Sequence, residues 1–74
     1  MTLREALPNE FFSEFMNTRT AKYLDVEVVK EKEFNWPGNH KNVYCWWVLE
    51  NGYAVGWNEN PARGWSFPVV RYNK

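Results

Sequence analysis

Apolar residues near the N-terminus recur at helical spacing. Leu7, Phe11 and Phe15 fall at positions i, i+4 and i+8, which is typical of a helix with one buried face. Proline is comfortable at the first position of a helix, where the backbone N–H has no partner within the helix. We therefore predict a helix over residues 8–18, with this stripe packed against the core.

A short polar motif precedes this helix. Thr2 and Glu5 form a T-x-x-E capping box, in which each residue satisfies a free backbone N–H of the other. Pro8 would interrupt a helix that ran through both segments, because proline lacks a donor and clashes with the preceding turn. The motif therefore predicts a separate, loose turn over residues 2–6.

The middle and the end of the chain alternate like half-exposed strands. In residues 23–34, valines alternate with acidic residues and a run of lysine and glutamate follows, which suits the edge of a sheet. Loop chemistry marks residues 35–40, and proline and glycine predict a turn over residues 60–64. Residues 65–72 form the last predicted strand. Pro68 requires an edge position there or an outward direction, because proline cannot donate to a ladder.

The Asn51-Gly52 pair gives the clearest local prediction. It separates two strand-like runs, residues 43–50 and 53–59. Asparagine and glycine adopt positive φ at the lowest cost, so the pair predicts a two-residue type I′ turn. Pairing outward from such a turn places Leu49 opposite Ala54, Val48 opposite Val55, Trp47 opposite Gly56 and Trp46 opposite Trp57.

This register assigns the large side chains of the sheet to two faces, because alternate residues of a strand point the same way. One face carries Tyr44, Trp46, Val48, Tyr53, Val55 and Trp57, and the other carries Val43, Cys45, Trp47, Leu49, Ala54 and Gly56. Opposite Trp47, Gly56 leaves room for an indole across the backbone. For the return strand we favour Trp65 opposite Trp57, which adds Phe67 to the first face.

These elements predict one small α+β domain over residues 1–74, with an N-terminal helix packed on a three- to four-stranded antiparallel β-meander. Such a domain buries only about 60% of the surface of its unfolded chain. Five tryptophans, five phenylalanines and four tyrosines supply a dense core. One helix covers one face of the sheet. The face with Trp46 therefore needs another cover, which is the loop around Trp36, a curled sheet or another molecule.

The uncovered aromatic face favours a non-enzymatic protein-interaction module, which binds a protein partner or forms a homodimer. Tryptophan and tyrosine are enriched among binding hot spots. An exposed apolar patch beyond a few hundred Å² normally marks an interface. The expected anchors are Trp46, Trp57, Trp65 and Phe67, with Tyr53 and Arg63 at the rim.

Single-stranded nucleic-acid binding is the alternative, because arginine and aromatic rings together can hold unstacked bases. Its residues would be Trp57, Arg63, Trp65 and Arg71. The formal net charge of zero weighs against it, since phosphate neutralisation needs a basic surface. A sugar-binding face of tryptophan, tyrosine and asparagine is a third interpretation, and the lack of a signal peptide weighs against that one.

No residue pattern predicts catalysis, a metal site or a cofactor. Cys45 and His40 are the only soft ligands, whereas a closed zinc site takes four. In one strand, their odd separation would place them on opposite faces. The hairpin puts Glu50 and Glu59 at its two ends, too far apart to act on one bond. We therefore expect no enzyme activity.

The sequence also predicts a cytoplasmic protein that does not bind membranes. No segment approaches the roughly 18 apolar residues of a membrane span, and the first residues lack the apolar run of a signal peptide. A lone cysteine fits a reducing compartment. The compact, tryptophan-rich, single-cysteine style is similar to that of small proteins of phage or prophage origin, and this similarity implies no functional residues.

Overall fold

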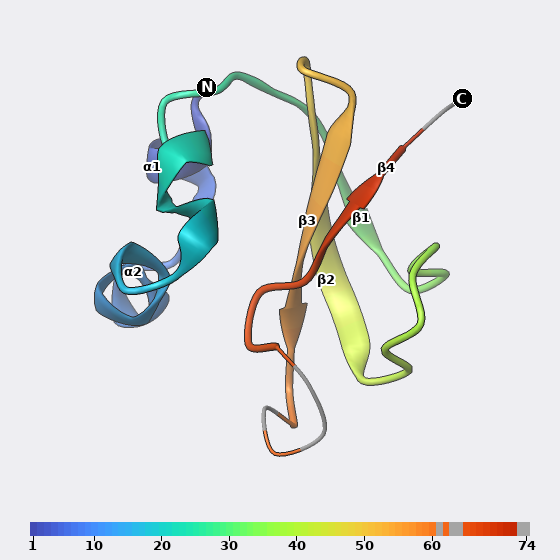
Figure 1. Ribbon diagram of the computed structural model, residues 1–74. Helices are drawn as coiled ribbons and strands as arrows, with labels where there is room; N and C mark the ends of the chain where they lie inside the picture. Colours follow the sequence, from blue (N-terminus) through green and yellow to red (C-terminus); the bar gives the residue numbers. More distant parts are fainter. Residues whose placement is uncertain (61, 63–64, 73–74) are drawn as a thin grey trace.

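The computed structural model describes residues 1–60, 62 and 65–72. An N-terminal helical segment lies on one side of a four-stranded antiparallel sheet with the strand order β1-β2-β3-β4 (Figure 1), which confirms the predicted α+β meander. The helices are α1 (Leu3–Ala6), α2 (Asn9–Met16) and the 3₁₀ helix η1 (Arg19–Tyr23). The strands are β1 (Val28–Glu33), β2 (Val43–Leu49), β3 (Tyr53–Asn58) and β4 (Val69–Arg71). The predicted turn over residues 60–64 lies for the most part outside the described residues.

The predicted capping box forms at the start of α1. The backbone N–H of Thr2 donates to the Glu5 carboxylate at 2.9 Å, and the Thr2 hydroxyl donates to it at 3.1 Å. The backbone hydrogen bond, and after it the hydroxyl bond, lowers the pKa of the Glu5 carboxyl, because both favour the charged form.

α2 begins and ends close to its predicted bounds. Pro8 is its N-cap, so the helix starts one residue later than expected. At the other end, the Thr18 hydroxyl donates to the Phe15 carbonyl oxygen at 2.7 Å. Phe15 is fully buried at 0% exposure, which confirms the core-facing stripe.

None of the helices in the described part of the chain is long and apolar enough to cross a membrane.

The strand predicted over residues 23–34 starts later than expected. Its first residues belong to η1 or to a turn, and β1 begins at Val28. The N-terminal segment runs alongside the residues in between. Leu3 N donates to the Val26 carbonyl at 3.0 Å, and Val28 N donates to the Met1 carbonyl at 2.7 Å. β1 is an edge strand, as its charges predicted.

The β2–β3 turn differs from the predicted type I′ turn. β2 ends at Leu49 and β3 begins at Tyr53, which leaves a three-residue loop. Gly52 alone in this loop has a positive φ, of 90°. The Asn51 side-chain oxygen instead accepts a hydrogen bond from Tyr53 N at 3.1 Å. This arrangement matches the three-residue hairpin loop in which glycine takes the left-handed position.

The longer loop moves the β2–β3 register by one residue, so the predicted pairing is wrong. Trp47 lies opposite Val55, and Trp46 lies opposite Gly56. A one-residue slip exchanges the two faces of a strand. Val55 and Trp57 therefore join Trp47 on the face that the helical segment covers.

The core on the helical side combines all three helices with the sheet. Its buried residues are Leu3, Leu7, Phe15, Leu24, Trp47, Leu49, Val55 and Phe67. The rings of Phe15 and Phe67 meet edge to face at 4.9 Å. Burying side chains of this size stabilises a fold by roughly 1.5–3 kcal/mol each, so this cluster is the main link between the two layers.

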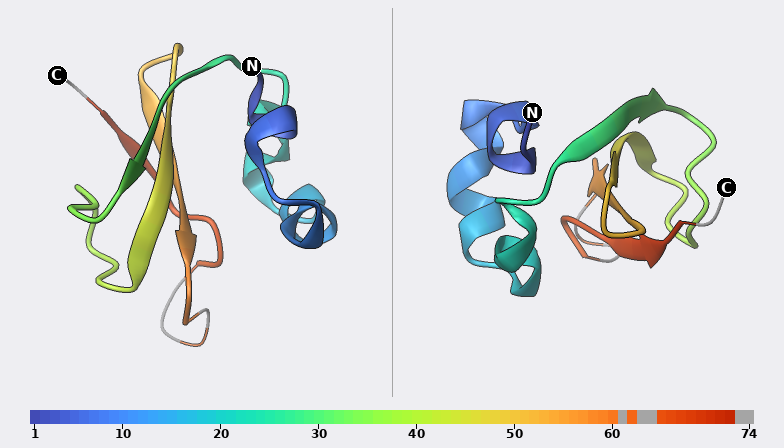
Figure 2. Two further views of the ribbon diagram at one scale, coloured as in Figure 1. Left: turned by 180° about the vertical axis from the view of Figure 1, so that it is seen from behind. Right: turned by 90° about the horizontal axis from the view of Figure 1, so that it is seen from above.

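The loop between β1 and β2 covers the opposite face of the sheet (Figure 2). Trp46 is buried there at 3% exposure. The Trp36 ring lies 5.5 Å from it, and the Tyr72 ring lies 5.4 Å from it, both edge to face. The loop around Trp36, one of the three covers that the sequence allows, therefore forms, and Tyr72 beside β4 adds to it.

Gly56 makes room for this second layer. A β-carbon at position 56 would lie 2.5 Å from Val43 Cγ1 and 3.2 Å from the Trp36 ring. The indole that crosses this glycine is therefore that of Trp36. The prediction that the Trp47 indole crosses it is wrong. A local bulge between Val43 and Cys45 turns Val43 toward this face.

The β3–β4 register differs from the prediction by two residues. The observed pairs are Tyr53–Arg71, Ala54–Val70 and Val55–Val69. Trp65 therefore falls beyond the paired residues and not opposite Trp57. Pro68 precedes an edge strand, as predicted, and its carbonyl oxygen accepts a hydrogen bond from Gly56 N at 2.9 Å.

We expect Gly56→Ala to lower the free energy of unfolding by about 1–3 kcal/mol, the usual cost of overpacking a filled core. In a Trp36→Ala background the same substitution should cost less, because one of the groups that the new β-carbon meets is gone. Urea unfolding of the four proteins measures both costs.

Gly52→Ala is the matched control for this comparison. It strains a φ of 90° at a position where an added β-carbon meets no atom of a described residue within 4 Å. Its cost should therefore be equal in the two backgrounds. If the cost of Gly56→Ala is equal in them as well, Trp36 does not lie over Gly56.

Glu5→Gln should lower the melting temperature at neutral pH and have less effect in acid. A carboxyl whose pKa is lowered in the folded state stabilises the fold at pH values above the pKa of the unfolded chain, which is 4.5 for Glu5. That contribution is lost as the pH falls through the lower, folded pKa. Melting curves of wild type and variant should converge toward about pH 2, and a constant difference would contradict the capping role.

Candidate functional site

The predicted aromatic binding face is not formed as one surface. Trp46 and Phe67 are each 3% exposed, and they lie in the cores on opposite sides of the sheet. The prediction that Trp46, Trp57, Trp65 and Phe67 share one exposed face is therefore wrong. Its physical cause is the three-residue β2–β3 loop, which exchanged the faces of β3. A binding role for any of the four stays a prediction.

Two members of the predicted nucleic-acid platform stack within the chain. Trp57 is half-buried, and its ring stacks on Phe11 with centroids 4.5 Å apart and an interplanar angle of 24°. The Arg71 guanidinium lies 5.6 Å from the centroid of the half-buried Tyr53 ring. Arg63, which both predicted sites include, lies outside the described residues. The remaining member, Trp65, is exposed.

Trp65 is 71% exposed, the largest fraction among the large hydrophobic residues that the structure describes. It borders a groove of about 510 Å³ between the start of η1 and the segment that leads into β4. We call this the Trp65 groove. Its described lining is Asn17, Thr18, Arg19, Thr20, Trp65, Ser66, Phe67, Pro68 and Val69. Sequence reasoning missed the groove, because one wall comes from residues 17–20, far away along the chain.

The segment that leads into β4, and Val69 at the start of β4, line this groove. The carbonyl oxygens of Ser66 and Pro68 accept hydrogen bonds from β3, each at 2.9 Å. Backbone groups alternate in direction along a strand, so those of Val69 and Arg71 point away from β3. Within the described part of the chain, no backbone hydrogen bond reaches these outward groups.

Positive charge borders the Trp65 groove. Among its described lining residues, Arg19 alone is charged. Farther along, the Lys22 ammonium lies 5.5 Å from the Tyr23 ring, and the Tyr23 ring lies 5.8 Å from the Tyr53 ring, over which Arg71 stacks. These three cations thus lie on the helical side of the sheet, near the groove, and two of them stack on tyrosine rings.

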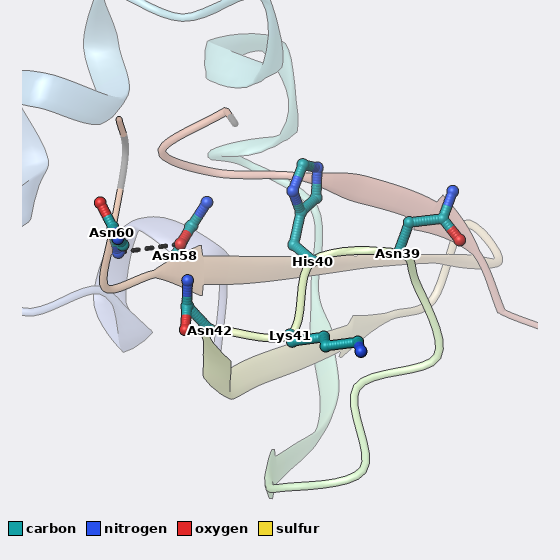
Figure 3. Close-up of a pocket in the computed structure, with 6 residues that line it drawn as sticks. All are labelled: Asn39, His40, Lys41, Asn42, Asn58 and Asn60. Atoms are coloured by element: carbon teal, nitrogen blue, oxygen red, sulfur yellow. Dashed lines mark hydrogen bonds between the residues drawn. The ribbon is translucent and has the colours of Figure 1, made fainter. Parts of the chain in front are cut away.

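A second hollow, of about 600 Å³, is polar (Figure 3). Figure 3 shows Asn42 near Asn58 and Asn60, at the end of β3, and the Lys41 side chain pointing away from them. The residues that line the hollow are Asn39, His40, Lys41, Asn42, Asn58 and Asn60. Amides at this density can donate to and accept from a polar ligand. We call this the asparagine hollow.

Asn58 is the buried member of the asparagine hollow, with 1% exposure. Its side-chain oxygen accepts a hydrogen bond from Asn60 N at 2.9 Å, which shapes the chain after β3. Its Nδ2 has no hydrogen-bond partner among the described residues and is closed to solvent. An unpaired buried donor costs about 1–3 kcal/mol. Because solvent cannot touch this nitrogen, a ligand in the hollow would not reach it.

The backbone is strained just after the end of β1. Phe34 and Asn35 have φ values of 62° and 56°, a region that costs most residues about 1–2 kcal/mol. The Trp46 indole N–H holds this bend by donating to the Phe34 carbonyl oxygen at 2.9 Å. The Phe34 ring, 60% exposed, meets Tyr44 edge to face at 6.0 Å. Nothing in the sequence signals a phenylalanine with positive φ.

The structure does not bring His40 and Cys45 together. His40 lines the asparagine hollow, whereas Cys45 lines a separate hollow with Ala6 and Pro8. Partial burial, and after it the charge of Glu33, raises the pKa of the Cys45 thiol, which makes it a weaker nucleophile at neutral pH. Within the described ranges, no group of three His, Cys, Asp or Glu side chains could hold a metal ion.

No protein-family model, curated protein or solved structure matches this chain. The Trp65 groove combines an exposed indole, free backbone groups and one sign of charge. The asparagine hollow has a buried amide that solvent does not reach. The Trp65 groove is the better candidate site.

Cys45 should react slowly with iodoacetamide at about pH 8 although it is exposed, because a raised pKa leaves little thiolate. Its rate should be lower than that of the same chain unfolded in urea. Glu33→Gln should raise the folded rate, whereas Glu14→Gln, on α2, should leave it unchanged. A folded rate equal to the unfolded one would contradict this account.

Proposed function

We propose that this chain is a non-enzymatic protein-interaction module that binds a partner protein through the Trp65 groove. The observation that carries the proposal is that Trp65 is 71% exposed, while the other four tryptophans are buried or half-buried. The chain covers both faces of its sheet and still leaves this indole in water. Tryptophan is among the residues most enriched in binding hot spots, so a partner that covers it gains apolar contact.

Order in the walls of the groove supports the proposal. Phe67 and Pro68 are buried on the sheet side. On the other side, the Thr18 hydroxyl is 2.7 Å from the Phe15 carbonyl oxygen and 2.7 Å from the Thr20 hydroxyl. A partner that enters a surface already held in place loses less conformational entropy than one that must order it.

The charges on β1 favour a different protein as the partner over a second copy paired along that edge. Lys30 and Lys32 lie opposite Val48 and Trp46, on one face of the sheet, and the neighbouring glutamates lie on the other face. Two-fold antiparallel pairing sets residues of the same face against each other, so lysine would meet lysine and glutamate would meet glutamate. Such charges protect an edge strand from pairing with itself.

Trp65→Ala should reduce the amount of partner that the immobilised chain captures from an extract of its source organism by about tenfold or more. Because most of the ring is in water, the variant should keep the near-UV circular dichroism and melting temperature of the wild type. Quantitative mass spectrometry of the captured proteins measures the loss.

Tyr44→Ala is the matched control, since it removes another exposed aromatic ring, 40% exposed, that does not line the groove. It should capture as much partner as the wild type. Trp57→Ala is less suitable, because that ring stacks on Phe11 and its loss would disturb the core. A folded Trp65→Ala protein with undiminished capture would refute the proposal.

A further inference from the structure

Resting on that proposed function, we infer that the partner presents an extended, acidic segment, which adds to the free edge of β4 as a further strand within the Trp65 groove. Adding a strand to an exposed sheet edge is a general way to bind a peptide, in which backbone hydrogen bonds give affinity and alternate side chains give specificity. The backbone, the charge and the exposed ring each support this occupant.

The backbone along β4 is suited to accept a strand. Val69 directs its backbone groups away from β3, and Arg71 follows in the same phase. Pro68 does not interrupt this row, because it lies at an alternate position, where its carbonyl oxygen bonds to Gly56 N on the inner side. The missing N–H of proline is therefore on the β3 side and not on the open edge.

The other edge of the sheet is less open. The start of β1 is covered by the N-terminal segment, since Val28 N donates to the Met1 carbonyl at 2.7 Å. The rest of β1 carries alternating lysine and glutamate, which protects an edge. β4 has one charged residue, Arg71. Of the two edges, β4 is therefore the one that a peptide can extend.

Charge complementarity makes the segment acidic. Arg19 lines the groove, Arg71 lies on β4, and Lys22 lies near the tyrosine pair that joins η1 to β3. No carboxylate is among the described lining residues. Two of the three cations stack on tyrosine rings, which leaves their charge available while fixing their position. Carboxylates on the incoming strand would meet these cations, and a basic strand would be repelled.

A second copy of this chain is the less favourable occupant. Two-fold pairing of two β4 edges would place the basic residues that border one edge against those that border the other. A single extended segment avoids this repulsion and fits between the β4 edge and residues 17–20. An apolar side chain on the same face of the segment as the carboxylates would cover Trp65.

The test uses the full chain and labelled ten-residue peptides. The first repeats Glu-Glu-Val-Val, so that each face of the strand carries both residue types, and the second has lysine in place of each glutamate. Two further copies of the first carry N-methyl groups either at every odd or at every even position. Fluorescence anisotropy measures binding to the wild type, to Trp65→Ala and to the neutral Arg19→Gln. Amide hydrogen exchange by NMR reports on Val69 and Arg71.

The inference expects the glutamate peptide to bind about tenfold or more tightly than the lysine peptide, and more weakly to Arg19→Gln. One N-methylated copy should lose binding and the other should keep it, because a strand bonds along one edge. Exchange at Val69 and Arg71 should slow by about tenfold or more on binding. Equal binding of the two charge types, an equal effect of the two methylations, or unchanged exchange would each overturn the inference.

A selection from a library of random twelve-residue peptides separates this failure from that of the proposed function. Peptides that bind the wild type and not Trp65→Ala, without enrichment in acidic residues, would overturn the acidic strand and leave the groove as an interface. A library with no Trp65-dependent binder would overturn both. Acidic binders that need Trp65 and Arg19 would support both. Sedimentation detects a second copy as occupant, which would overturn the acidic strand.

Discussion

The contact between Gly56 and the Trp36 ring is the constraint on which the rest of the structure depends. Both faces of the sheet are apolar, and the helical segment covers one of them. A β-carbon at position 56 would lie 2.5 Å from Val43 Cγ1 and would press on the indole at 3.2 Å. With glycine there, the β1–β2 loop becomes a second layer over Trp46. A chain of 74 residues can then bury large rings on both sides of its sheet.

This arrangement makes the exposed residues informative about binding. The chain buries its other four tryptophans at least in part, so the exposure of Trp65 stands out. The two edges of the sheet also differ in how open they are to a partner. β1 carries charges that repel a copy of itself, whereas β4 has outward backbone groups beside a basic groove. The proposals for function follow from these two asymmetries and not from the number of aromatic residues.

Several elements could be predicted because their causes lie within a few residues. The capping box of Thr2 and Glu5, the buried face of α2 and the edge position of Pro68 all follow from local chemistry. The β2–β3 turn shows where such reasoning ends. Asn51 could have taken the positive φ that a type I′ turn needs, and its side chain accepts a hydrogen bond from Tyr53 N instead. The sequence pattern is compatible with both outcomes.

The sequence by itself determined the class of fold, the order and rough bounds of most elements, and Trp65 as one residue of a candidate interface. The tertiary structure decided which face each large ring occupies and which rings stay in water. The physical reason is that one extra loop residue exchanges the two faces of a strand at little local cost. Only the packing of distant segments, with α2 on one side of the sheet and Trp36 on the other, makes one register lower in free energy.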